Sequence, residues 1–119
     1  MAKETDSGHS FEAFYKRATS PLVVLRLLSE KPMYGYEITL EMKQRSGGKY
    51  TMSLLYPVLY RLLDQGYVCE DHTEVAVGRA RTYYAITPEG LEYYKRTVQD
   101  YRRISGVFEQ LLEGGPGDD

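Results

Sequence analysis

The order of apolar and polar positions divides the chain into several helical segments and one short region of two-residue alternation. Helical spacing begins at Phe11, and the pair Ser20-Pro21 is typical of a helix start. We therefore expect two successive helices, over residues 11–18 and 22–29. The second is apolar on nearly all sides, which predicts that it is the central buried helix. A further helix is expected over residues 36–46, ending at Gly47-Gly48.

The next helical segment is predicted to begin with Thr51 as its N-cap and to end at Gly66. Its inner face is formed by five apolar residues at helical spacing: Leu55, Val58, Leu59, Leu62 and Leu63. Pro57 would lie about two turns inside it, where a proline costs about 3 kcal/mol by removing a hydrogen bond. We expect the apolar spacing to prevail, with a kink.

After Gly66 the spacing of apolar positions changes from the helical period to a period of two residues. Residues 67–70 and 81–86 are predicted to be strands, joined by a tip over residues 75–80. Cys69 alternates with acidic neighbours, so we expect a half-buried structural thiol. Thr87-Pro88-Glu89 then combines an N-cap, a first-turn proline and a first-turn acid. This pattern predicts a long helix that extends to about Glu113.

The last helix carries a coiled-coil-like seam, in which steps of three and four residues alternate. The seam consists of Leu91, Tyr94, Val98, Tyr101, Ile104, Phe108 and Leu111. A helix of about 25 residues is roughly 37 Å long, more than so small a domain needs for its own cover, so we expect a homodimer. The aromatic residues of the seam are either interface core or, since a tyrosine hydroxyl needs a partner, the wall of a ligand cavity at Tyr94 and Tyr101.

Composition narrows the classes of function. At 119 residues the chain has room for one domain, and 15 Lys and Arg against 17 Asp and Glu exclude a strongly basic protein. One Cys and two His predict neither a disulfide framework nor a metal site, and no nucleophile–base set or phosphate loop indicates an enzyme or a cofactor. The chain has neither a membrane span nor a signal peptide, so a cytoplasmic, nucleoid-associated location is expected.

Charge placement changes this picture. The charged residues between Glu41 and Asp64, and between Glu74 and Glu89, are all basic: Lys43, Arg45, Lys49, Arg61, Arg79 and Arg81. A helix-turn-helix followed by a hairpin is a winged helix, whose recognition helix enters the major groove while the wing reaches the adjacent backbone or minor groove. We therefore predict a mostly α fold with a small β-hairpin (α+β). A winged-helix domain over 11–87 and a dimerisation helix over 88–113 would lie between disordered tails, 1–10 and 114–119.

Several motifs together carry a family resemblance: PMYGYEI at 32–38, SGG at 46–48, LYPVLYRL at 55–62, GYV at 66–68, GRAR at 78–81 and YYAITPEG at 83–90. This combination resembles the PadR family of bacterial transcriptional regulators, and the single helix after Gly90 resembles its short-form subfamily. The resemblance implies a homodimeric winged-helix repressor on a palindromic operator. It also implies that aromatic or planar drug-like ligands bind between the subunits.

The same resemblance places the start of the recognition helix at Thr51, Met52, Ser53, Leu54 and Tyr56, and the wing arginines at Arg79 and Arg81. Leu54 stands where the family usually has Thr, so it can offer a base only an apolar contact, as with a thymine methyl. The helical spacing adds Tyr60 and Arg61 to the outward face, and Lys49 is expected to contact the DNA backbone. Two alternatives to DNA binding remain. The outward face of this helix is an ordinary solvated surface, or the winged helix is a module that binds other proteins and not DNA.

Overall fold

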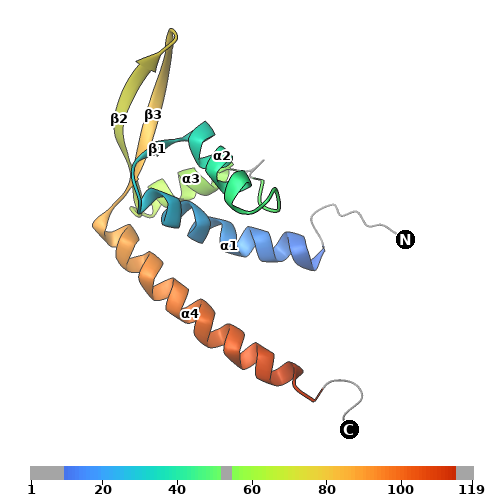
Figure 1. Cartoon of the computed structure of the whole chain (residues 1–119). Coiled ribbons are helices and arrows are strands. Elements are labelled where there is room, and N and C mark those ends of the chain that lie inside the picture. The colour runs from blue at the N-terminus through green and yellow to red at the C-terminus, as the bar shows by residue number, and fades with distance from the viewer. Residues whose placement is uncertain (1–9, 52–54, 115–119) are drawn as a thin grey trace.

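The computed structural model describes residues 10–51 and 55–114 (Figure 1). Its elements are α1 (Phe11–Leu28), β1 (Met33–Tyr34), α2 (Gly35–Arg45), α3 (Leu55–Asp64), β2 (Val68–Ala76), β3 (Arg79–Ile86) and α4 (Pro88–Leu112). The described residues form four helices and a small three-stranded antiparallel sheet, so the predicted α+β winged-helix fold is confirmed. Of the tails predicted at 1–10 and 114–119, residues 1–9 and 115–119 lie outside the described residues, and Ser10 is the N-cap of α1.

α1 is one continuous helix, and the prediction of two helices over 11–18 and 22–29 is wrong. The Ser10 side chain caps it by accepting from the Ala13 amide at 3.1 Å, and Pro21 lies in the helix interior. In the turn before the proline, the hydroxyls of Thr19 and Ser20 donate to backbone carbonyls four residues earlier. Pro21 has no N–H to donate to the carbonyl of residue 17, and the two hydroxyls add hydrogen bonds in the turn that precedes it.

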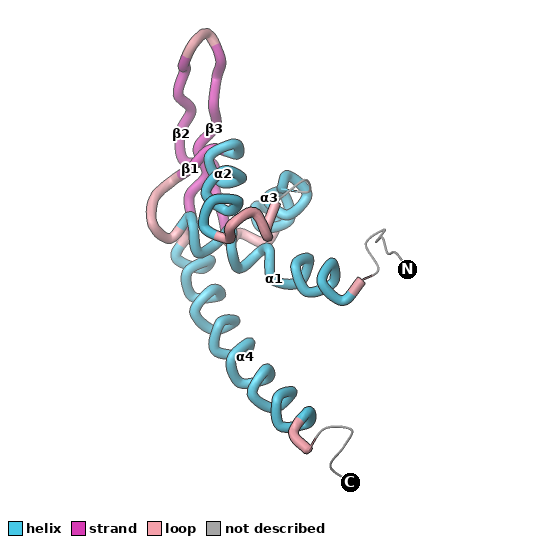
Figure 2. Tube along the Cα trace, turned by 45° about the vertical axis from the view of Figure 1, so that its right-hand side comes forward, coloured by secondary structure: helices cyan, strands magenta, loops and turns pink. Residues whose placement is uncertain are grey.

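The sheet has the order β1-β3-β2, and β1 is a strand that the hydropathy pattern did not predict. It pairs Met33 with Tyr84 and Tyr34 with Tyr83. The hairpin of β2 and β3 rises away from the helices as the wing (Figure 2). Both wing strands are longer than predicted, because Val75 and Ala80 are paired residues of the ladder. The tip is therefore Val77-Gly78 alone and not residues 75–80.

The core lies where α1, α2 and α3 meet the base of the sheet. Leu25 of α1, Ile38 of α2 and Leu59 of α3 are completely buried, as the helical spacing predicted. Cys69 is exposed, which contradicts the expected half-buried thiol, because its side chain points from β2 away from the core residue Val68. α3 is described from Leu55 onward; Met52, Ser53 and Leu54 lie outside the described residues.

α4 begins as predicted: the Thr87 side chain accepts from the Gly90 amide at 2.9 Å, and Pro88 occupies the first turn. Its N-terminal part packs on the body of the domain, and its C-terminal end extends away from the other described elements (Figures 1 and 2). No helix of the described ranges is long and apolar enough to span a membrane.

Candidate nucleic-acid interface

The outward face of α3 carries polar aromatic and basic side chains. Leu55, Val58 and Leu59 turn inward, and this fixes Tyr56, Tyr60 and Arg61 on the opposite, exposed side. The rings of Tyr56 and Tyr60 lie 5.9 Å apart, centroid to centroid, and are about half exposed. The arrangement presents two adjacent phenol groups and one guanidinium to solvent, as the sequence predicted for this face.

The two wing arginines of β3 differ in their surroundings. Arg79, next to the tip, is exposed. Arg81 is half-buried, and the central carbon of its guanidinium lies 4.7 Å from the centroid of the Tyr34 ring. Such a cation–π contact fixes the charge in place without neutralising it. The wing thus presents one extended and one immobilised positive charge.

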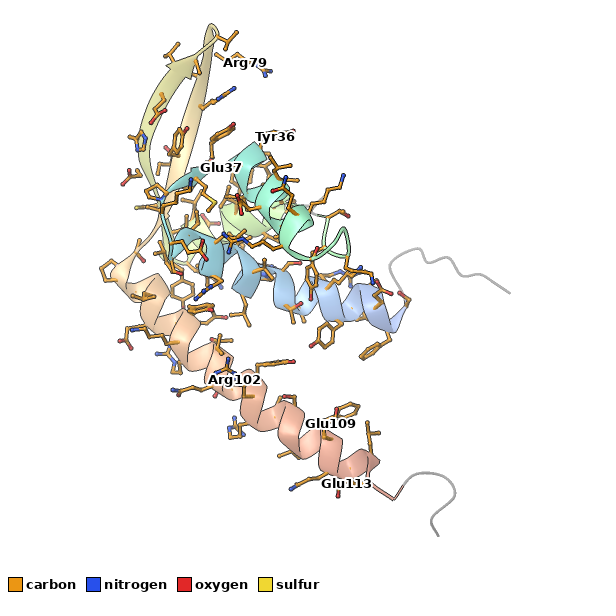
Figure 3. All side chains as sticks on the ribbon, in the orientation of Figure 1. Tyr36, Glu37, Arg79, Arg102, Glu109 and Glu113 are labelled. Atoms are coloured by element: carbon orange, nitrogen blue, oxygen red, sulfur yellow. The ribbon has the colours of Figure 1, made fainter. Side chains whose placement is uncertain are left out.

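Residues predicted from the third helix and from the wing meet in one groove. Tyr56 of α3 and both wing arginines line a groove of about 570 Å³ between β3 and the start of α2. Figure 3 shows Arg79 and Tyr36 on the same side of the wing. The remaining lining consists of residues that the sequence did not assign to a site: Tyr34, Gly35, Tyr36, Ala80, Thr82 and Tyr84. A local signal existed only in the motif PMYGYEI, with two tyrosines around a glycine.

Not every predicted residue joins this groove. Tyr60 and Arg61 lie further along α3, and the exposed Lys49 and Thr51 precede α3 in the chain. Met52, Ser53 and Leu54, which were expected to read bases, fall outside the described residues. The groove therefore unites the wing with the described start of α3.

The structure places acids from outside the two basic segments next to some of their arginines. Arg45 donates to both carboxylate oxygens of Glu30, at 2.7 and 2.8 Å, and to Glu41 at 2.9 Å, so it holds α2 to the end of α1. On the wing, β2 places Glu74 opposite Arg81. The wing is basic along β3 and acidic along β2.

The acidic strand of the wing contains a small histidine cluster. His72 lies between Asp71, at 2.6 Å from Nδ1, and Glu74, at 3.0 Å from Nε2, and stacks on the Tyr83 ring. The Asp71 and Glu74 carboxylates raise the pKa of His72 above its ordinary value. Within the described ranges no group of three or more Asp, Glu, His or Cys side chains is arranged to hold a metal ion.

The predicted seam of α4 is divided between the body of the domain and solvent. Leu91, Tyr94 and Val98 are half-buried, whereas the C-terminal members are exposed: Tyr101, Ile104, Phe108 and Leu111. Phe108 keeps 51% and Leu111 keeps 77% of its surface exposed. The structure therefore brings the seam against α1 from Tyr94 to Tyr101 and leaves its last three members as an exposed apolar face.

Tyr94 and Tyr101, the predicted ligand residues, line one pocket of about 310 Å³ between α1 and α4. The opposite wall comes from α1, including Tyr15, whose hydroxyl lies 3.0 Å from that of Tyr101. This hydrogen bond raises the pKa of Tyr15. The sequence did not assign Tyr15 to a site.

Comparison with known proteins agrees with this architecture. The family model described as "Transcriptional regulator PadR-like family" matches residues 24–96. Transcriptional regulator Rv3488 of Mycobacterium tuberculosis is 29% identical over 100 residues, which cover 84% of this chain and 89% of that protein. An uncharacterised protein of Lysinibacillus sphaericus is 31% identical over 94 residues, covering 77% of this chain and 86% of its own.

Solved structures are similar over the same region. A transcriptional regulator from Clostridium thermocellum (Cth-833) superposes with a TM-score of 0.76 at 29% identity, covering 84% of this chain and 99% of that one. A PadR family transcriptional regulator from Eggerthella lenta gives a TM-score of 0.75 at 27% identity, covering 84% and 87%. The matched region contains the core, the wing and the start of α4, so the chain belongs to the PadR-like family of transcriptional regulators, which are not enzymes.

Proposed function

We propose that the chain is a homodimeric, sequence-specific DNA-binding repressor. The observation that carries this proposal is the groove in which Tyr56 of α3 meets Arg79 and Arg81 of the wing. In the proposed complex α3 enters the major groove and the wing contacts the adjacent backbone or minor groove. The hydroxyls of Tyr56 and Tyr60 set the register on phosphates, and residues of the first turn, Ser53 and Leu54, read bases.

The exposed half of the α4 seam supports the dimer. Ile104, Phe108 and Leu111 form an apolar face that this chain does not cover among its described residues. Pairing of two such faces buries them and relates two recognition helices by a twofold axis. This twofold symmetry would make the operator palindromic, with half-sites about 34 Å apart, one turn of B-DNA.

A salt titration on duplex DNA tests the proposal. Sequences selected from a random duplex pool serve as the target, and log K should fall linearly with log salt because phosphate contacts release counterions. Arg79→Ala should weaken binding to all sequences and reduce the slope by about 1, whereas changes at Ser53 or Leu54 should alter which sequence wins. Arg102→Ala is the matched control, because Arg102 lies on α4, far from the wing (Figure 3).

Two results would contradict DNA binding. One is an affinity that ignores salt; the other is the absence of measurable binding at low salt. Recovery of a stable protein partner from cell extract without DNA would then favour the protein-interaction module.

The pocket between α1 and α4 supports a second part of the proposal, a small aromatic effector. Tyr94 and Tyr101 supply ring faces, and the hydroxyl pair Tyr15–Tyr101 supplies a polar end. Binding of planar aromatic compounds should quench tyrosine fluorescence and weaken DNA affinity, since coupling between two sites is reciprocal. If Tyr101→Ala leaves the binding of these compounds unchanged, the effector does not bind here.

A further inference from the structure

One side of the groove is an unpaired strand edge. β1 has only two residues and pairs with Tyr83 and Tyr84, so the edge of β3 over residues 79–82 has no strand beside it among the described residues. The chain turns from β1 directly into α2 at Gly35. The first turn of α2 therefore faces the free edge of β3 across the groove.

The start of α2 offers unsatisfied donors. Tyr34 is its N-cap, and no side chain accepts from the first amides. The first N–H groups of a helix have no partner within the helix, and they form the positive end of its dipole. Gly35 has no Cβ at this point, and an added Cβ would overlap the Tyr56 hydroxyl. The phenol of Tyr56 thus lies directly against the helix start.

A second, independent feature is the buried phenol of Tyr84. Its side chain lines the groove and is only 7% exposed, yet its hydroxyl has no hydrogen-bond partner within residues 10–51 and 55–114. Buried polar groups are almost always paired, so such a hydroxyl indicates a missing ligand atom. Burial also raises the pKa of Tyr84.

The charges around the groove favour an anion. Arg81 is held in place by the Tyr34 ring, and Arg79 extends beside it. Glu37, in the first turn of α2, is paired with Lys31 at 2.9 Å. Glu70 is the cross-strand partner of Tyr84 on β2; it is exposed and does not line the groove. The groove itself is lined by two arginines and no acid.

We propose that this groove is a phosphate-binding site, in which the hydroxyls of Tyr84 and Tyr56 and the first amides of α2 hold one phosphate that Arg81 neutralises. The inference rests on the proposed function, because the phosphate then belongs to the DNA strand that passes between the wing and α3. A free phosphate or a nucleotide carries the same chemistry. Tyr84 is a binding residue in this assignment and not merely part of the core.

Tyr84→Phe tests the site, with Tyr83→Phe as the matched control on the same strand. Tyr83 is half-buried against Tyr34 and His72 and does not line the groove. Tyr84→Phe should lower duplex affinity by about 3- to 10-fold, as the loss of one hydrogen bond to a charged group. The loss should be equal for all sequences because phosphate contacts carry no sequence information. Thermal stability should not fall, since the variant removes an unpaired buried hydroxyl.

Modified duplexes and inorganic phosphate distinguish a phosphate of the DNA backbone from a free phosphate. If the phosphate is on DNA, a neutral methylphosphonate at one backbone position should weaken the wild type and leave Tyr84→Phe unaffected. If it is free, inorganic phosphate should raise the melting temperature of the wild type and of Tyr83→Phe, but not that of Tyr84→Phe.

The outcomes distinguish this inference from the proposed function. DNA binding by the wild type that Tyr84→Phe does not weaken overturns the phosphate site and leaves the DNA-binding regulator standing. A wild type that binds no DNA overturns the regulator proposal; the phosphate site then survives only if inorganic phosphate stabilises the protein through Tyr84. If the wild type neither binds DNA nor is stabilised by inorganic phosphate, both the regulator proposal and the phosphate site are overturned.

Discussion

At the scale of single residues, the tyrosines combine apolar packing with a polar end. Tyr67 and Tyr93 stack with ring centroids 4.3 Å apart and join the start of β2 to α4. Tyr34 packs its ring under the Arg81 guanidinium, and Tyr15 and Tyr101 pair their hydroxyls across two helices. Each ring contributes buried area while its hydroxyl remains near solvent or a partner. Tyrosine therefore suits surfaces that are exposed to water in the free chain and covered when a partner binds.

The wing tip provides a test at this scale. Val77 and Gly78 both have positive φ, +52° and +72°, as in a type I′ turn. A β-branched residue is strained there, and Asn-Gly is the preferred pair for such turns. Val77→Asn should therefore raise the free energy of unfolding by about 1 kcal/mol, roughly the cost of a left-handed residue. Urea denaturation measures this change in the free energy of unfolding.

Val75→Asn is the control, because Val75 is also exposed but pairs with Ala80 in the ladder, where Asn is disfavoured. It should not stabilise the protein. Equal effects of the two substitutions would contradict the assigned turn.

At the scale of elements, the junction of α4 with the sheet depends on Gly90. An added Cβ there would overlap the Tyr67 carbonyl, and the same carbonyl accepts from the Thr87 amide at 3.0 Å. Gly90→Ala should therefore destabilise the protein by about 1 to 3 kcal/mol, the usual cost of overpacking. Gly106→Ala is the matched control on the same helix, since nothing lies within 4 Å of its added Cβ.

The control should stabilise the protein by up to about 1 kcal/mol through helix propensity. Thermal unfolding of both variants gives the comparison. A Gly90→Ala variant as stable as the wild type would show that α4 can shift away from Tyr67 without loss.

The elements also show what the sequence could and could not predict. Helices with an apolar face and the Thr87-Pro88 start of α4 were predictable because their signals are local. The outer half of β2 is exposed on both faces, so no alternation revealed its length. β1 is two residues long and exists only through pairing with Tyr83 and Tyr84, fifty residues away in the chain.

The same distinction holds for the site. Tyr56, Arg79 and Arg81 were predictable from residue type and motif, and the structure unites them in the groove. The contributions of Gly35 and Tyr84 were not, because they depend on contacts between segments far apart in the sequence. The sequence placed Arg45 in a basic segment without an acidic neighbour, but its partner Glu30 lies 15 residues earlier.

At the scale of the whole molecule, the chain is elongated, with principal extents of 64 × 36 × 23 Å. The wing and the C-terminal end of α4 lie at opposite ends in Figure 1. Pairing through the distal half of α4 would therefore leave the wing and α3 uncovered. This separation lets one end of the chain hold a second copy while the other contacts DNA.

Phe108→Glu tests whether α4 makes the dimer on which DNA affinity depends. Phe108 is half exposed in the single chain, so a charge there should not disturb the fold but should be excluded from a paired apolar face. Sedimentation equilibrium should show a monomer at micromolar concentration, and affinity for a two-half-site duplex should fall by about 10²- to 10⁴-fold as avidity is lost. Gln99→Glu adds the same charge at an exposed position of α4 off the seam and should remain dimeric. A dimeric Phe108→Glu protein would contradict the seam, and a monomer with unchanged affinity would show that one chain suffices on DNA.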